Sequence, residues 1–148
     1  MAQLDQLYQQ IILDHAKERH GRGLIDPEPG HRHGESHQLN PVCGDEITLR
    51  TCLDHGTITS LTWEGDGCAI SQASASILAD LGPGLTRDDL IVRVDAFRDL
   101  MRSRGKGEAD EELLGDAAAL TGVSRFPARV KCAMLAWVAL EEALLAAN

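Results

Sequence analysis

Two runs of residues around a tight turn constrain the fold of this chain more than any other feature. In residues 45–53 apolar side chains such as Ile47 and Leu49 alternate with polar ones, which is the period of a half-buried β-strand. Asp, His and Gly follow at 54–56, and residues 57–63 are rich in the β-branched side chains that strands favour. The pattern predicts an antiparallel hairpin. The segments just before and just after it are therefore expected to finish side by side.

The rest of the chain has mainly helical periodicity, with boundary residues such as Thr86 and Pro127. Helices are expected at the start of the chain up to residue 19, and at 69–81, 86–102, 111–120 and 127–147. The stretch 20–34 is rich in glycine and is expected to form a surface loop, followed by a short strand at 35–39. These elements predict a single domain over residues 1–148. Its expected class is α+β, with a small antiparallel sheet of about three strands packed against helices.

Composition argues against several classes of function. Lys and Arg number 14 against 23 Asp and Glu, a net charge of −9, and aromatic residues make up 3%. Such a chain lacks the basic surface and the stacking side chains that bind nucleic acid, so no nucleic-acid partner is expected. No apolar run reaches the roughly 18 residues of a membrane span, and the first residues do not resemble a secretion signal. We therefore expect a cytoplasmic protein without a membrane partner.

Three of the four cysteines lie where the predicted fold can bring them together. Cys43 and Asp45 are two residues apart, so in an extended segment their side chains share one face. Cys68 follows the hairpin and is expected beside them, and Cys132 falls near the start of the last helix, which can pack on the sheet. Three thiolates and a carboxylate suit a four-coordinate zinc ion. The spacing alone leaves a second interpretation open, in which these cysteines are small buried apolar residues.

Four further side chains receive no role from the pattern. Alternation places Cys52 on the face of its strand opposite to Ile47. His31, His33 and His37 are spaced along the predicted loop, but nothing in the sequence fixes their geometry, so a solvated loop is favoured over a second metal site.

Three segments, NPVCGDEITLR, GDGCAISQASASIL and RVKCAMLAW, resemble in order the three motifs of the IscU/NifU-type iron–sulfur assembly scaffolds. The resemblance covers nearly the whole chain, from LYQQIILDHAKERHGRG onward. Within the family the chain is more similar to the SufU branch. It has a long insertion at about residues 104–123, and Lys131 stands where scaffolds are expected to carry histidine.

The resemblance implies a zinc ion held by Cys43, Asp45, Cys68 and Cys132. It also implies a sulfurtransferase-like role as sulfur acceptor for a SufS-type cysteine desulfurase, with Cys43 taking the persulfide. Arg129 lies three residues before Cys132, on the same helical face, and can pair with Asp45 when the ligand set rearranges; a solvated surface charge is the alternative.

Two other functions remain open at this stage. The chain can be a scaffold on which iron or an iron–sulfur cluster is held and then handed to apo-proteins, or a purely structural zinc domain.

Overall fold

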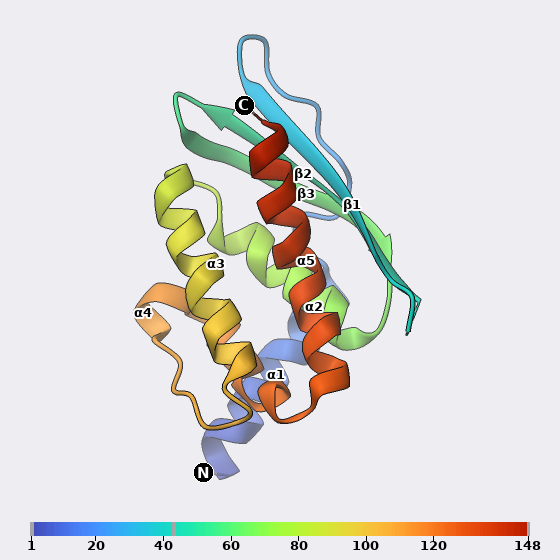
Figure 1. Ribbon diagram of the computed structural model, residues 1–148, viewed down its shortest axis with the longest axis vertical. Coiled ribbons are helices and arrows are strands. Elements are labelled where there is room, and N and C mark those ends of the chain that lie inside the picture. Colours follow the sequence, from blue (N-terminus) through green and yellow to red (C-terminus); the bar gives the residue numbers. More distant parts are fainter. Residues whose placement is uncertain (1, 43, 148) are drawn as a thin grey trace.

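The computed structural model describes residues 2–42 and 44–147, which form a three-stranded antiparallel sheet with helices (Figure 1). The sheet order is β1-β2-β3. The strands are β1 (Arg32–Asn40), β2 (Asp45–Asp54) and β3 (Thr57–Asp66). The helices are α1 (Ala2–Glu18), α2 (Ala69–Leu81), α3 (Arg87–Arg102), α4 (Glu111–Leu114), the 3-10 helix η1 (Gly115–Arg125) and α5 (Pro127–Ala146). The predicted α+β class is confirmed.

The helices begin where their capping residues predict. Thr86 accepts a hydrogen bond from the Asp89 amide at 3.2 Å before α3, and Pro127 occupies the first turn of α5. The predicted helix at 111–120 is divided into α4 and η1 at Gly115, whose φ of 54° departs from helical geometry. Among the residues that the structure describes, none of the helices has both the length and the apolar character needed to cross a bilayer.

Strand β1 is longer than the predicted 35–39, because its inner face is covered by a helix backbone instead of apolar side chains. Gly34 lies on that face, opposite the buried Thr51. A Cβ atom placed on Gly34 would lie 1.8 Å from the carbonyl oxygen of Ala143 in α5. Helix α5 therefore rests directly on β1, as Figure 1 shows, and this contact defines a strand that the hydrophobic pattern only partly reveals.

A polar and aromatic contact fixes α5 relative to α2 and α3. The rings of Phe97 and Trp137 stack with centroids 4.1 Å apart, and both side chains are fully buried. The Trp137 indole donates to Ser74 Oγ at 2.9 Å, and Ser74 donates to the Ala133 carbonyl at 2.6 Å. Because Ala133 follows Cys132 and Ser74 lies in the helix that starts after Cys68, these contacts set the positions of both cysteines.

Cys52 lies on the predicted outer face of β2 but is only 2% exposed. The loop that precedes β1 crosses this face. Arg50 donates to Asp26 Oδ1 at 3.0 Å, and Thr62 Oγ1 accepts from the Ile25 amide at 3.2 Å. Cys52 is thus buried under a loop, away from the inner face of the sheet, and the structure gives it no role in the candidate site.

Candidate metal centre

Three of the four predicted ligands meet at one end of the sheet. One ligand atom from each of Asp45, Cys68 and Cys132 lies within 4.8 Å of the other two. Asp45 begins β2, Cys68 immediately precedes α2, and Cys132 lies in the first turns of α5. The fourth predicted ligand, Cys43, falls outside the described residues. The predicted hairpin therefore brings Asp45 and Cys68 together, and the packing of α5 supplies Cys132.

Asp45 is the most deeply buried of these ligands, with 2% of its surface exposed. Its Oδ1 accepts a hydrogen bond from the Cys68 amide at 3.1 Å, and its Oδ2 lies 3.5 Å from Cys68 Sγ. Within the described parts of the chain, no Lys, Arg or His forms an ion pair with Asp45. A buried carboxylate without a protein cation is costly, and a metal cation at this point would compensate its charge.

The two cysteines differ in exposure. Cys68 is exposed and stands at the N-cap position of α2, where its side chain makes no capping hydrogen bond. Cys132 is buried, and its Sγ lies 3.8 Å from the Ala128 carbonyl oxygen. The centre thus has one sulfur that an incoming group can approach and one that is enclosed by α5.

Gly67 allows the carboxylate of Asp45 to approach the chain just before Cys68. A Cβ atom at this position would lie 2.8 Å from Asp45 Oδ1 and 2.3 Å from Ser71 Oγ. Such distances are shorter than real contacts, so the observed arrangement requires glycine here.

Asn40 is a buried polar residue of this centre that the sequence pattern does not reveal. It faces Asp45 across the β1–β2 ladder and is 6% exposed. Its Oδ1 accepts from the Val42 amide at 3.2 Å, which fixes the orientation of the side-chain amide, while its Nδ2 has no partner among the described residues. Leaving a buried donor unpaired costs about 1–3 kcal/mol. An anionic set of sulfur and oxygen ligands offers acceptors for such a donor, so Asn40 fits a negatively charged site.

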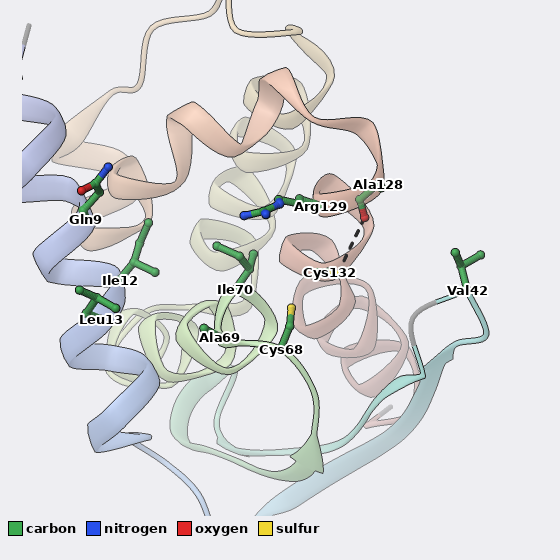
Figure 2. A pocket seen from close by; sticks show the side chains of 10 residues that line it. All are labelled: Gln9, Ile12, Leu13, Val42, Cys68, Ala69, Ile70, Ala128, Arg129 and Cys132. Carbon is green, nitrogen blue, oxygen red and sulfur yellow. Dashed lines mark hydrogen bonds between the residues drawn. The ribbon is translucent and has the colours of Figure 1, made fainter.

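The cysteines lie at the edge of an apolar groove of about 590 Å³ between α1, α2 and α5. Its lining residues are Gln9, Ile12, Leu13, Val42, Cys68, Ala69, Ile70, Ala128, Arg129 and Cys132. Figure 2 shows Arg129 directed from α5 toward α1, with Ile70 and Cys68 on the side of α2. The groove leaves the exposed Cys68 open to a partner, and most of its lining side chains are apolar.

In this structure Arg129 forms no ion pair with Asp45, but the prediction concerns the state after the ligand set rearranges. Its guanidinium carbon lies 5.9 Å from the ring centroid of Phe126, and no acidic side chain of the described residues pairs with it. It nevertheless lines the same groove as Cys68 and Cys132. Pairing with Asp45 after a rearrangement stays a prediction.

The family model for the NifU-like N-terminal domain matches residues 7–144. The chain belongs to this family. This NifU-like domain is 40% identical over 141 residues to a zinc-dependent sulfurtransferase SufU of Bacillus subtilis (strain 168), covering 95% of this chain and 91% of the relative. It is 36% identical over 145 residues to an iron–sulfur cluster assembly scaffold protein IscU of Streptococcus pyogenes serotype M1, covering 97% of this chain and 86% of the relative.

A solved structure confirms the NifU-like fold. The N-terminal part of a nitrogen-fixing NifU-like protein from Brucella abortus superposes with a TM-score of 0.79 at 26% identity, covering 95% of this chain and 94% of that one. The similarity in fold extends over nearly the whole of both chains.

The histidines at 31, 33 and 37 do not lie together in a loop of this NifU-like domain. His33 and His37 belong to strand β1, and His31 precedes it. His37 Nε2 lies 3.1 Å from Glu46, and His31 Nε2 lies 3.7 Å from Asp54. Each of these two therefore faces its own acid. In the described chain the three histidines do not form a group that could hold one ion.

Proposed function

We propose that this chain is a zinc-dependent sulfur acceptor in iron–sulfur cluster assembly, and that it receives sulfur on Cys43 from a SufS-type cysteine desulfurase. Iron–sulfur cluster assembly is the function that family membership supports; one relative is named as an assembly scaffold and another as a zinc-dependent sulfurtransferase. The finer assignment to sulfur transfer is our inference from the site.

The observation that carries the proposal is the convergence of Asp45, Cys68 and Cys132 within 4.8 Å. With Cys43 added, the donor set is three thiolates and one carboxylate, which matches the tetrahedral preference of zinc. The buried charge of Asp45 and the unpaired donor of Asn40 both fit a bound cation with an anionic ligand set. Zinc held by Cys43, Asp45, Cys68 and Cys132 would keep the thiols ionised and ready to react.

The proposed reaction is a thiol–persulfide exchange. The Cys43 thiolate attacks the outer sulfur of a persulfide on the desulfurase; a new S–S bond forms as the old one breaks, and the desulfurase cysteine leaves as a thiolate. The apolar groove beside Cys68 and Cys132 is the proposed approach for that persulfide. Arg129, in the same groove, is proposed to pair with Asp45 when the ligands rearrange.

Intact-mass measurement after incubation with a SufS-type desulfurase and cysteine tests the sulfur-acceptor role. We expect the wild-type chain to gain sulfur and to stimulate the desulfurase, and Cys43→Ala to do neither. Cys52→Ala is the matched control, because that thiol is buried on the outer face of the sheet. Sulfur loading of Cys43→Ala equal to wild type would refute the role of Cys43.

The second candidate function is a scaffold for an iron–sulfur cluster. The 36% identity to an IscU favours it, and cysteine thiolates are also the ligands of such clusters. Anaerobic reconstitution with iron and sulfide should then give a coloured cluster that passes to an apo-protein, and a chain that stays colourless excludes this function. Zinc binding with neither sulfur loading nor cluster transfer would instead indicate a structural zinc domain.

Gly67→Ala is expected to weaken zinc binding by about tenfold or more, because its Cβ would displace the Asp45 carboxylate. Competition with a chromophoric chelator measures the affinity. The same Cβ also meets Ser71, so Gly67→Ala is compared in a Ser71→Ala background that removes this second clash. If the Gly67→Ala/Ser71→Ala double variant binds zinc as tightly as Ser71→Ala alone, displacement of Asp45 is not the cause of the weakened binding.

A further inference from the structure

A second group of metal-ligand side chains lies where the end of α1 meets α2. One nitrogen from each of His15 and His20 and one carboxylate oxygen of Asp80 lie within 4.8 Å of one another. Asp80 is twelve residues after Cys68, and at about 1.5 Å per helical residue the two are roughly 18 Å apart along α2. This group is therefore separate from the Asp45–Cys68–Cys132 centre.

One ring nitrogen of His15 is bonded to a serine, as in many metal-ligating histidines, and the other lies against Asp116, which a bound metal ion would have to displace or share. His15 is 5% exposed, and its Nδ1 lies 2.7 Å from Ser76 Oγ. Ser76 Oγ also accepts the backbone amide of His20 at 2.9 Å, so one serine fixes the positions of both histidines. A ligating imidazole commonly has its other nitrogen bonded to an oxygen, which orients the ring.

The surrounding charge favours a cation. His15 Nε2 lies 2.9 Å from Asp116, and His20 lies 2.6 Å from Asp80 and 3.6 Å from Glu18. In the described chain these three carboxylates have ion pairs only with the two histidines. Two neutral imidazoles and three carboxylates carry a net charge of −3, which a divalent cation would reduce.

We propose that His15, His20 and Asp80 form a second metal site, which takes a divalent transition ion such as zinc and ties the end of α1 to α2. Two imidazoles and a carboxylate are a normal ligand set for zinc, with the fourth position left to water or to a neighbouring carboxylate. Because the ligands are nitrogen and oxygen, the site differs from the cysteine centre in chemistry as well as in place. It does not depend on the proposed sulfur transfer.

Zinc titration of the zinc-loaded protein, followed by isothermal calorimetry and by thermal unfolding, tests the second site. We expect wild type to bind one further equivalent, with a rise in Tm as the site fills. Asp80→Asn, a nearly isosteric change at an exposed position, should lose that equivalent while keeping the fold, and His20→Ala should lose it as well. His55→Ala is the matched control, because that side chain is 95% exposed and outside the group.

The outcomes separate the two sites. A titration in which wild type takes up no further zinc overturns the proposal, and so does a second equivalent that survives in both Asp80→Asn and His20→Ala. If Asp45→Asn loses the zinc already loaded and keeps the further equivalent, that loss concerns the cysteine centre alone. The experiment can therefore overturn the second metal site while the proposed function stands, and the proposed function can be refuted while the second site stands.

Discussion

Replacing Gly34 by alanine is expected to lower the free energy of unfolding by about 1–3 kcal/mol, the usual cost of forcing an extra methyl group into a packed interior. The new Cβ would lie 1.8 Å from the Ala143 carbonyl oxygen and 2.8 Å from the Ala147 amide nitrogen. Both are backbone atoms at the end of α5, so no side chain can move aside to make room. Urea unfolding measures the change.

Gly122→Ala is the control for that experiment, because no atom lies within 4 Å of a Cβ built at Gly122. Its stability is expected to stay close to that of wild type. Equal stability of Gly34→Ala and Gly122→Ala would contradict the direct contact between α5 and β1.

Asp45→Asn is expected to weaken zinc binding by more than the roughly 10–100-fold that loss of an outer-shell partner causes, since it removes a charged ligand. Asparagine keeps an oxygen to accept the Cys68 amide, so the backbone arrangement of the site should persist. Competition with a chelator gives the affinity, and circular dichroism checks the fold.

Glu46→Gln supplies the comparison for Asp45→Asn. Glu46 is the next residue of β2, but it is exposed on the other face and pairs with His37. Zinc affinity should be unchanged in this variant. If Asp45→Asn bound zinc as tightly as Glu46→Gln, Asp45 would not be a ligand.

The elements with local signals could be predicted from the sequence. The alternation in β2, the capping by Thr86 and the proline at 127 each act within a few residues, and the corresponding strand and helices are confirmed. The first residues of β1 could not be recognised, because Gly34 faces a helix backbone and carries no hydrophobic signal. The burial of Cys52 also depends on a distant loop, which periodicity within a strand does not describe.

The candidate metal centre was predictable in part. The hairpin placed Asp45 beside Cys68, but delivery of Cys132 depends on contacts such as that between Trp137 and Ser74, which spacing alone does not contain. The group at His15 joins positions more than sixty residues apart in the sequence, His15 and Ser76 being separated by 61. Helical periodicity predicts that α1 is amphipathic, but not which residues of α2 it meets.

The placement of Cys132 in the last helix has a consequence for how the protein matures in the cell. Asp45 and Cys68 are translated at least 64 residues before Cys132, and only the later segment supplies α5, which packs on β1 and β2. A nascent chain emerging from the ribosome therefore holds an incomplete set of donors. The metal ion proposed for this centre is therefore expected to bind tightly only after α5 has been made and packed, so a product truncated before Cys132 should not retain it tightly.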